Sequence, residues 1–305
     1  MKPPEFRAGV IEGFFGRPWG WPARQSSIAF GLGLTPFEIY RNYDDDAKTN
    51  LRSKLSQINE IGPEILCILF DDMDGSIDRL GEQQARVISD VCSWSSAGHF
   101  IVCPTYYSDD PVLAKLFGVT PQSYLHDLGR LVDPLIDIFW TGEKVISDRY
   151  SEVHLADVAH RIGRKPFIWD NHIANDSRIR SNFLFLDPSA GGWELPADRA
   201  AGLAVNPMNQ PCLSRIALMG YQSLLCANRN DLLPNVCRLL CGSSFAQLLL
   251  EDAHVLQNVG FAGLDSKEFA RLLDRYSSRG TDPYAREIAS WLSGEYAFDP
   301  QCLTE

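Results

Sequence analysis

The segment Glu64-Ile65-Leu66-Cys67-Ile68-Leu69-Phe70-Asp71-Asp72 joins an uninterrupted apolar run to two adjacent carboxylates. Gly62-Pro63 precedes the run and Gly75 follows it, so its length is typical of a strand that is buried on both faces of a parallel sheet. Open α/β sheets and barrels hold their chemistry at the carboxyl ends of such strands. The segment therefore predicts a parallel sheet that delivers Asp71 and Asp72 to its functional edge.

Two carboxylates crowded at a strand end favour acid–base chemistry. They repel each other and lie partly in a low dielectric, so one should keep a proton near neutral pH while the other stays ionised. General acid and base catalysis at an acetal or an ester requires that combination. The alternative for Asp71 and Asp72 is structural: the pair could cap the following turn or form an ion pair, and such pairs perturb carboxylates as well.

Composition and charge limit the partners. The chain has 305 residues, enough for one large domain and a small one, with ordinary hydrophobic (45%) and charged (22%) fractions. A formal net charge of −11 argues against a nucleic-acid or anionic-membrane partner, since both need a basic surface. Residues 1–6 lack the apolar core of a secretory signal and no stretch has the length of a membrane span, so we expect a cytoplasmic protein with no membrane partner.

The eight cysteines indicate buried thiols rather than a metal centre. They include no Cys-x-x-Cys pair, and most lie in apolar runs. Cys237 and Cys241 share a helix face and could in principle ligate a metal, but two further ligands are not evident nearby. We therefore expect free thiols in a reducing cytoplasm, no bound metal and no cofactor.

Short apolar runs alternate with helix-like stretches over residues 9–207. The runs are 9–16, 30–36, 64–72, 99–107, 135–142, 165–171 and 201–207. Apolar residues at helical spacing predict helices at 44–61, 82–97 and 151–162, which stop at Gly62, Gly98 and Gly163. This alternation predicts a parallel sheet with right-handed crossovers.

Polar and aromatic residues close nearly every run, which is the expected layout of the active face of a (β/α)8 barrel. Only seven strands are apparent, and the 13 residues Arg17–Ala29 between the first two runs are too few for a strand-to-strand step of about 30 residues. We therefore predict a TIM-type α/β barrel that lacks one strand–helix unit, over residues 1–228 and incomplete between residues 17 and 30. Helical patterns at 231–240, 244–258, 266–277 and 283–292 predict a small helical appendage over residues 229–305.

An ordered set of short motifs resembles one enzyme family. It begins with Gly9-Val10-Ile11-Glu12-Gly13-Phe14-Phe15-Gly16-Arg17-Pro18-Trp19 and ends with Asn206-Pro207. Between these lie Leu69-Phe70-Asp71-Asp72, Cys103-Pro104-Thr105-Tyr106-Tyr107, Trp140-Thr141-Gly142, Trp169-Asp170-Asn171 and Ala174-Asn175-Asp176. In this order the motifs strongly resemble glycoside hydrolase family 84, which contains the O-GlcNAcases and the bacterial β-N-acetylglucosaminidases once called hyaluronidases.

The resemblance implies a retaining exo-β-N-acetylglucosaminidase, in which the acetamido oxygen of the substrate is the nucleophile and an oxazoline is the intermediate. Asp71 would accept a hydrogen bond from the acetamido N–H and stabilise the positive charge that develops. Asp72 would protonate the leaving oxygen and then activate water. Tyr107 would donate its hydroxyl to the acetamido oxygen. The implied partner is a glycan or glycoprotein that carries GlcNAc.

The same resemblance implies a set of substrate-binding residues. The wall around the acetamido methyl group would be formed by Trp169, Thr141 and Val145. The sugar hydroxyls would be bound by Asn171, Asp176, Asn206 and the backbone of Gly13. Each residue also has a simpler interpretation: the aromatic residues could fill the core, the asparagines could form turns, and Asp176 could cap a helix.

Two departures from the family pattern bear on activity. The chain has Phe14-Phe15-Gly16 where the family usually has Phe-Tyr-Gly, and it lacks a Tyr-Ala-Pro-Lys motif whose lysine binds a sugar hydroxyl. A barrel without that unit must close with seven strands, leave an open edge or be completed by a homodimer, and its affinity for GlcNAc should fall. The leading hypothesis is an active enzyme; the alternatives are an impaired GlcNAc-binding relative and, third, a Mg²⁺ site at residues 71–74.

Overall fold

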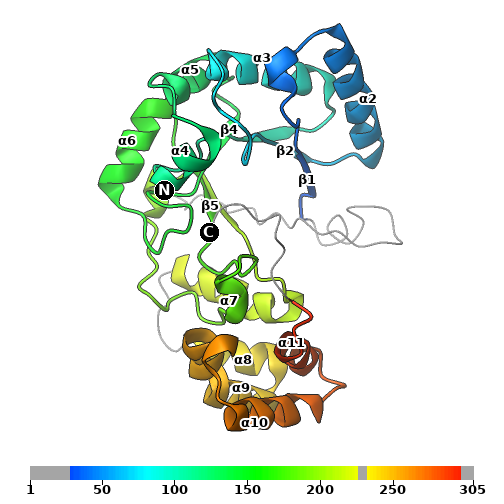
Figure 1. Cartoon of the computed structure of the whole chain (residues 1–305), viewed down its shortest axis with the longest axis vertical. Coiled ribbons are helices and arrows are strands. Elements are labelled where there is room, and N and C mark those ends of the chain that lie inside the picture. The colour runs from blue at the N-terminus through cyan, green and yellow to red at the C-terminus, as the bar shows by residue number, and fades with distance from the viewer. Residues whose placement is uncertain (1–27, 226–231, 297–305) are drawn as a thin grey trace. The chain divides into compact units, whose positions relative to one another are not determined.

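The computed structural model describes residues 28–225 and 232–296, and its organising element is a sheet of six strands. The strands are β1 (Gly31–Leu34), β2 (Ile65–Leu69), β3 (His99–Cys103), β4 (Asp137–Trp140), β5 (Phe167–Asp170) and β6 (Gly202–Val205). They are hydrogen-bonded in sequential order from β1 to β6 (Figure 1). Each of them lies inside one of the predicted apolar runs, so six of the seven strand predictions are confirmed; the run 9–16 lies outside the described residues.

The order and direction of the strands are those of a barrel wall. Parallel pairs place Gly31 beside Ile65, Ile65 beside His99, and Ile101 beside Asp137. A doubly wound sheet would reverse its strand order at a switch point, whereas here each new strand is added on the same side. The described part of the chain therefore contains an α/β half-barrel that corresponds to part of a TIM-like fold.

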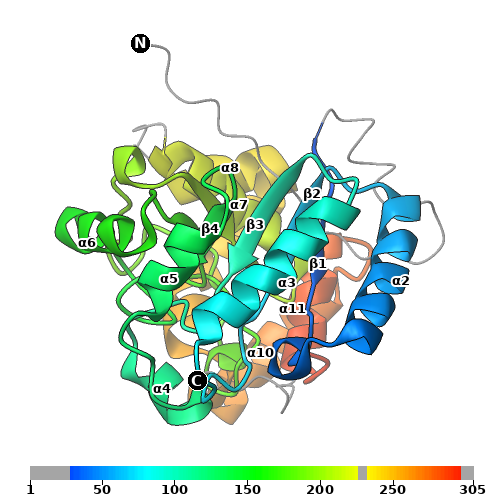
Figure 2. The same cartoon turned by 90° about the horizontal axis from the view of Figure 1, so that it is seen from above.

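Helices α2, α3, α5 and α6 lie outside strands β1–β5 (Figures 1 and 2). The helical elements of this region, in chain order, are η1 (Ile39–Asn42), α2 (Asp45–Ile61), α3 (Leu80–Trp94), α4 (Pro111–Phe117), α5 (Tyr124–Leu131), α6 (Glu152–Ile162) and η3 (Ala197–Arg199). Each connection between neighbouring strands from β1 to β5 therefore includes a helix, as a parallel sheet requires.

Helix α2 shows how the sequence sets both ends of such a helix. The carboxylate of Asp44 accepts a hydrogen bond from the Ala47 amide (2.9 Å) and caps the first turn. Gly62 takes a left-handed conformation, with φ of 67°, and ends the helix. The buried stripe between these ends consists of Leu51, Leu55 and Ile58. The helix predictions at 44–61 and 151–162 are confirmed, and Gly163 ends the second of them in the same left-handed way.

Helix α3 ends earlier than Gly98, where the sequence predicts its stop. Its last residue is Trp94, and Ser95 is already extended. The cause lies on α2: the side-chain amide of Asn59 donates to the Trp94 carbonyl (2.9 Å) and accepts from the Ser96 amide (2.9 Å). A side chain from a neighbouring helix thus supplies hydrogen bonds to the backbone at the end of α3. The apolar periodicity of α3 cannot predict this contact.

Helices α4 and α5, which connect β3 and β4, are absent from the sequence prediction. The sequence does hold a signal for α4: the Asp110 carboxylate accepts from the Val112 amide (3.0 Å), and Pro111 occupies the first turn. Helix α5 has only 8 residues, which is too short for a periodic apolar stripe to stand out.

The described residues form two compact units. The first consists of the described residues up to Val145, Tyr150–Trp169 and Pro196–Ala204. The second consists of Ile146–Arg149, Asp170–Leu195 and the described residues from Val205 onwards. Two of the points at which the chain passes from the first unit to the second lie at the carboxyl ends of β5 and β6. The predicted domain boundary at residue 228 lies outside the described residues and stays a prediction.

The second unit is mainly helical. Its elements are η2 (Arg180–Asn182), α7 (Pro211–Leu225), α8 (Leu232–Cys241), α9 (Ser243–His254), the π-helical turn η4 (Val255–Val259), η5 (Phe261–Gly263), α10 (Ser266–Ser277) and α11 (Pro283–Leu292). The predicted helices 266–277 and 283–292 are present as α10 and α11. Among the residues that the structure describes, no helix has the length and apolar character needed to cross a membrane.

Arg164 ties the end of α5 to the start of β4. Its guanidinium donates to the carbonyls of Gly129 and Val132 at the end of the helix (2.7 and 2.9 Å). It also donates to the carbonyls of Asp133 and Ile136 in the loop that follows (2.6 Å each). A helix end leaves carbonyls without intrahelical partners, and one planar cation supplies the missing donors here.

We predict that Arg164→Lys lowers the free energy of unfolding by about 2–4 kcal/mol, because an ammonium group donates from a single point and cannot span these carbonyls. Urea-induced unfolding followed by circular dichroism measures the change. Arg130→Lys is the matched control on the same helix: 59% of the Arg130 side chain is exposed, and the substitution should change the free energy by less than about 0.5 kcal/mol. Equal losses in the two variants would contradict the role of Arg164.

Candidate active site

The carboxylate pair lies immediately beyond β2, where the chain leaves the sheet. The amide of Phe70 donates to the Cys103 carbonyl (2.9 Å), which continues the pairing of β2 with β3 beyond the end of β2. Asp72 then takes a left-handed conformation, with φ of 54°. Among residues other than glycine, Asp and Asn tolerate this region best, and such conformations cluster at functional sites. An aspartate therefore suits the turn that ends this strand.

Asp71 is the more buried member of the pair. Its pKa is raised to about 6, chiefly because burial removes water and also because Asp72 adds a negative charge nearby. Hydrogen bonds from its own backbone and from the Cys103 thiol partly oppose the rise in pKa. Its Oδ1 atom is buried and has no hydrogen-bond partner among the described residues. A hydrogen-bond donor on a ligand can supply the partner that this buried acceptor lacks.

Asp72 is exposed to solvent, yet its pKa is also raised, because the surrounding protein displaces part of its water. The hydroxyl of Tyr107 donates to its Oδ1 atom (3.2 Å), which lowers the pKa and offsets part of the rise. Two of the predicted catalytic residues, from the ends of β2 and β3, are thus in contact. The two carboxylates differ in kind: Asp71 is buried with an unfilled acceptor, and Asp72 is within reach of solvent.

The loop after the pair is held by Asp74. Its carboxylate accepts hydrogen bonds from the Ser76 amide (2.8 Å) and the Ser76 hydroxyl, and it forms an ion pair with Arg41. The Tyr40 hydroxyl donates to the Asp74 backbone carbonyl (2.7 Å). Asp74 therefore holds the loop against η1 and has a structural role, unlike the candidate site residues Asp71 and Asp72.

The adjacent tyrosines at the end of the run 99–107 have different roles. Tyr107 contacts Asp72, as described above. The Tyr106 hydroxyl donates instead to the Gly118 carbonyl (2.7 Å), and its ring lies so close to Gly75 that any Cβ there would overlap with it. Tyr106 is therefore a structural residue, and Tyr107 is the candidate site residue.

Thr141 and Val145 lie in one turn beside Tyr107. The Thr141 amide donates to the Tyr107 carbonyl (2.9 Å), and the Thr141 hydroxyl donates to the Lys144 carbonyl (3.0 Å). The Val145 amide donates to the Asp110 carboxylate (3.3 Å). Both side chains of the turn are buried. These bonds hold the end of β4 against the end of β3.

Trp169, in β5, is half-buried. Its ring meets the ring of Phe139 in β4 edge to face, with centroids 4.9 Å apart and an interplanar angle of 78°. This contact holds the indole in place while part of it remains accessible, which is what a pocket wall requires.

The remaining predicted site residues belong to the second unit, except Gly13, which lies outside the described residues. The Asn206 side chain donates to the Asn171 side-chain oxygen (3.0 Å), so these two residues are brought together. Asp176 is exposed. The next helical element, η2, has Ile179 at its cap position and no side-chain cap, so Asp176 does not cap it.

Asp170, between two predicted site residues, has a structural role. Its carboxylate is completely buried and accepts hydrogen bonds from the Tyr221 hydroxyl (2.5 Å) and the Trp193 indole N–H (3.0 Å). It thereby anchors the segment that leads to Asn171. The donors lie 51 and 23 residues away along the chain, so no local sequence signal could have identified them.

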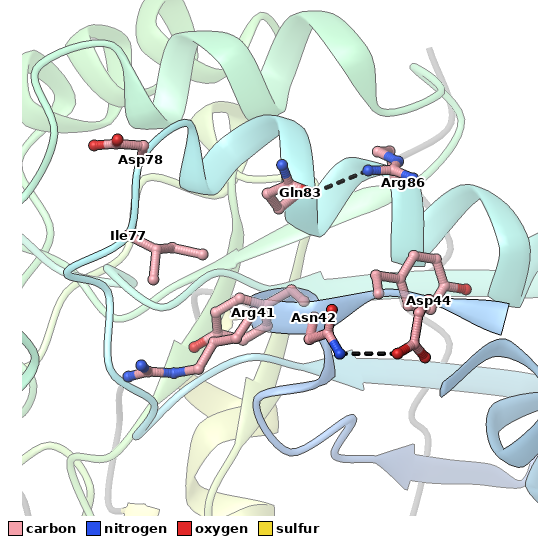
Figure 3. A pocket seen from close by; sticks show the side chains of 9 residues that line it. Arg41, Asn42, Asp44, Ile77, Asp78, Gln83 and Arg86 are labelled. Atoms are coloured by element: carbon pink, nitrogen blue, oxygen red, sulfur yellow. Dashed lines mark hydrogen bonds between the residues drawn. The ribbon is translucent and has the colours of Figure 1, made fainter. Parts of the chain in front are cut away.

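A polar pocket of about 460 Å³ is lined by residues of η1, the two residues between η1 and α2, and α3 with the loop before it (Figure 3). Its polar groups pair with one another: Arg86 donates to Gln83 (3.1 Å) and Asn42 donates to Asp44 (2.8 Å). None of the predicted site residues lines it. The pocket is therefore separate from the candidate site.

Within residues 28–225 and 232–296, no three His, Cys, Asp or Glu side chains are grouped so that they could hold a metal ion. The acidic residues at 71–74 contact Tyr107 and Arg41 instead. The Mg²⁺ hypothesis therefore has no cluster of ligands to support it in the described part of the chain.

A parallel half-barrel that presents two unlike carboxylates beyond one strand end has the arrangement of a barrel hydrolase that uses acid–base chemistry. The family model for β-N-acetylglucosaminidase matches residues 28–232. The chain belongs to this family, glycoside hydrolase family 84.

Individual relatives are more distant. The protein O-GlcNAcases of Rattus norvegicus and Mus musculus are each 25% identical to the chain over 261 residues, a match that covers 66% of the chain and 28% of either relative. The chain thus spans less than a third of the length of these relatives. A solved structure of a mutant O-GlcNAc hydrolase from Thermobaculum terrenum matches with a TM-score of 0.65 and 22% identity, covering 90% of this chain and 61% of that one. This likeness shows a shared fold.

The raised pKa of Asp71 has a consequence for stability. Its value in the folded protein, about 6, lies above the ordinary 3.8, so ionising the buried carboxyl destabilises the fold as pH rises through this interval. We predict that Asp71→Asn raises the free energy of unfolding by about 1–3 kcal/mol at pH 8 and much less at pH 4, where the folded protein keeps the proton. Urea unfolding at both pH values measures this.

Asp72→Asn is the matched control for this prediction, because the neighbouring carboxyl is exposed and its removal should give a smaller gain at pH 8. A loss of stability at pH 8 on replacing Asp71 would show that its carboxylate makes a favourable contact, and would contradict the expectation.

Proposed function

We propose that the chain is a retaining exo-β-N-acetylglucosaminidase that hydrolyses terminal β-linked GlcNAc by substrate-assisted catalysis. The observation that supports this most strongly is the placement of two carboxylates of different exposure, Asp71 with a buried oxygen that lacks a partner and Asp72 exposed, with Tyr107 in contact with the second. Membership of the β-N-acetylglucosaminidase family supplies the chemical class.

Asp71 orients the internal nucleophile in this proposal. Its buried Oδ1 atom accepts the N–H of the acetamido group, which points the acetamido carbonyl oxygen at the anomeric carbon. As that oxygen attacks, the C–O bond to the leaving group breaks and positive charge develops on the oxazoline. An ionised Asp71 stabilises this charge in a site from which water is largely excluded.

Asp72 moves the protons. It gives its proton to the glycosidic oxygen as the bond to the leaving group breaks. It then takes a proton from the water that attacks the anomeric carbon, and the oxazoline reopens to the acetamide with the original configuration. The solvent exposure of Asp72 suits both steps, because leaving group and water must each reach it. In the same proposal the single proton of the Tyr107 hydroxyl turns from Asp72 to the acetamido oxygen when the sugar binds.

The other predicted residues bind the sugar. The half-buried Trp169, with Thr141 and Val145, forms the wall around the acetamido methyl group; the edge contact of Trp169 with Phe139 and the closed turn at Thr141 support this role. The sugar hydroxyls are bound by Asn171, Asp176, Asn206 and Gly13. A buried polar group that a substrate leaves unpaired would cost affinity, so these residues select the sugar.

The proposal extends to architecture and location. We infer a (β/α)8 barrel that lacks one strand–helix unit after its first strand, with a C-terminal helical region, and a homodimer as one way to cover the open edge. The substrate is a GlcNAc-bearing glycan or glycoprotein in the cytoplasm. The second candidate is a relative that binds GlcNAc without turning it over, which the missing Tyr-Ala-Pro-Lys motif favours.

The proton-transfer role of Asp72 is tested with two substrates. We predict that Asp72→Asn lowers kcat/KM about 10²–10⁴-fold on phenyl β-GlcNAc, whose leaving group needs a proton. On a dinitrophenyl β-GlcNAc, whose leaving group needs none, the loss should be at least tenfold smaller. Asp71→Asn is the matched variant and should slow both substrates alike. Equal losses on both substrates in Asp72→Asn would contradict the proton-transfer role.

Assays with and without EDTA test the Mg²⁺ alternative, because loss of turnover on chelation would revive it. A folded wild-type protein that binds GlcNAc in calorimetry but releases no phenol would reject the enzyme hypothesis in favour of the binding relative.

The proposal also predicts a pH profile. Asp71 must be ionised to act, and its pKa is about 6, so kcat/KM on phenyl β-GlcNAc should fall as pH is lowered through this value. Initial rates between pH 4.5 and 8 at low substrate concentration measure the profile. A kcat/KM that stays constant down to pH 4.5 would contradict the need for an ionised Asp71.

A further inference from the structure

A closed ring of hydrogen bonds joins Gln84 of α3, Thr105 after β3 and Tyr124 of α5. These residues are 0%, 0% and 1% exposed. The Tyr124 hydroxyl donates to the Gln84 amide oxygen (2.5 Å), and the Gln84 amide nitrogen donates to the Thr105 hydroxyl (2.8 Å). The Thr105 backbone amide donates to the Tyr124 hydroxyl (2.9 Å) and completes the ring. Each member is both donor and acceptor, so only one orientation of the Gln84 amide fits.

The ring is joined to the segment that carries the carboxylates. The Thr105 hydroxyl uses its one proton to donate to the carbonyl of Phe70 (2.8 Å), the residue immediately before Asp71. The Phe70 amide is bound to the Cys103 carbonyl (2.9 Å), so both backbone polar groups of Phe70 are fixed from the β3 side. Thr105 itself precedes Tyr107 by two positions. The Thr105 side chain therefore adds a second link between the ends of β2 and β3, beside the backbone hydrogen bond.

The ring depends on a close approach of α3 to α5, which lie side by side (Figure 2). At Gly81 of α3 a Cβ would come within 3.0 Å of the Tyr124 carbonyl oxygen. A glycine at this position lets the two helices come close enough for Tyr124 to reach Gln84.

We propose that Gln84, Thr105 and Tyr124 are positioning residues, which hold the Asp71-Asp72 pair at working distance from Tyr107. The expected effect of these residues on kcat rests on the hydrolytic function proposed above. Two side-chain hydrogen bonds join the segments that follow β2 and β3. The first runs from Thr105 to Phe70, and the second, two residues further along both segments, runs from Tyr107 to Asp72 (3.2 Å). A displacement of about 1 Å between reacting groups can cost about 10²-fold in rate, so the Thr105–Phe70 hydrogen bond affects catalysis by keeping Tyr107 at a fixed distance from the carboxylates.

Stability alone does not require such a ring. Replacing both partners of a buried hydrogen bond by apolar groups of the same shape is often neutral, whereas removing one partner leaves the other unsatisfied. A fully satisfied polar ring selects a single geometry for the segments that it joins. Here those segments are the two strand ends that carry the proposed catalytic residues.

The test is Thr105→Val, which keeps the shape of the side chain and removes the hydroxyl. We expect kcat on phenyl β-GlcNAc to fall about 10–100-fold, with KM changed less than about threefold, in a protein whose circular dichroism is unchanged. Thr105→Ser restores the hydroxyl and should recover most of kcat. Tyr124→Phe should lower kcat in the same direction.

Tyr43→Phe is the matched control. Tyr43 is also a buried tyrosine of the first unit, and its hydroxyl donates to Asp90 of α3 (2.8 Å), away from any strand end. Its loss should lower the melting temperature and leave kcat unchanged. If Tyr43→Phe and Tyr124→Phe lower kcat equally, or if Thr105→Val lowers only the melting temperature, the positioning role is overturned.

A second measurement does not depend on turnover. The pKa of the Asp71 carboxyl, about 6 because of burial and the neighbouring Asp72, can be followed by ¹³C NMR. In Thr105→Val a loosened strand end would admit water, and this pKa should fall towards about 4. If the wild type hydrolyses no β-GlcNAc but this fall occurs, the hydrolase proposal fails and the positioning ring stands. An unchanged pKa together with an unchanged kcat would overturn the ring.

Discussion

The candidate site depends on the parallel pairing of β2 with β3 and on its continuation past the last residue of β2. Leu69 pairs with Cys103, and the Phe70 amide then donates to the Cys103 carbonyl (2.9 Å). A slip of one residue in this register would turn every side chain of the strand to the other face. The register therefore determines that Asp71 lies beside Cys103 and that Tyr107 reaches Asp72.

Asp71 differs from two buried carboxylates elsewhere in the described residues, whose oxygens accept several hydrogen bonds. Asp170 accepts hydrogen bonds from a tyrosine and a tryptophan (2.5 and 3.0 Å). Asp252, in the second unit, accepts from Arg271, Arg275 and Tyr276 (2.8, 3.0 and 2.9 Å). In contrast, Asp71 keeps an oxygen without a partner among the described residues, at a cost in stability that its raised pKa reflects. Costs of this kind are typical of sites that a ligand completes.

Local patterns in the sequence predict all six described strands and the carboxylate pair, and they fail where a distant partner decides the outcome. Apolar runs locate β1 to β6 because buried parallel strands need continuous apolar residues. The end of α3 is missed because Asn59 of α2 supplies the missing hydrogen bonds. The Gln84–Thr105–Tyr124 ring joins residues 21 and 40 positions apart, so periodicity cannot reveal it. Thr105 stands inside a recognised motif, but its partners are defined only by the fold.

The two adjacent aspartates have unequal properties because their surroundings differ. Asp71 lies two residues beyond the end of β2, is partly enclosed by the protein and accepts a hydrogen bond from the Cys103 thiol of β3. The left-handed conformation of Asp72 turns the chain away from that path, which leaves its carboxylate exposed and in contact with Tyr107. An acid–base pair needs two environments for one chemical group, and usually distant residues supply them. Here the left-handed backbone of Asp72, directly after the more enclosed Asp71, places two consecutive identical side chains in different surroundings, which is what separate roles require.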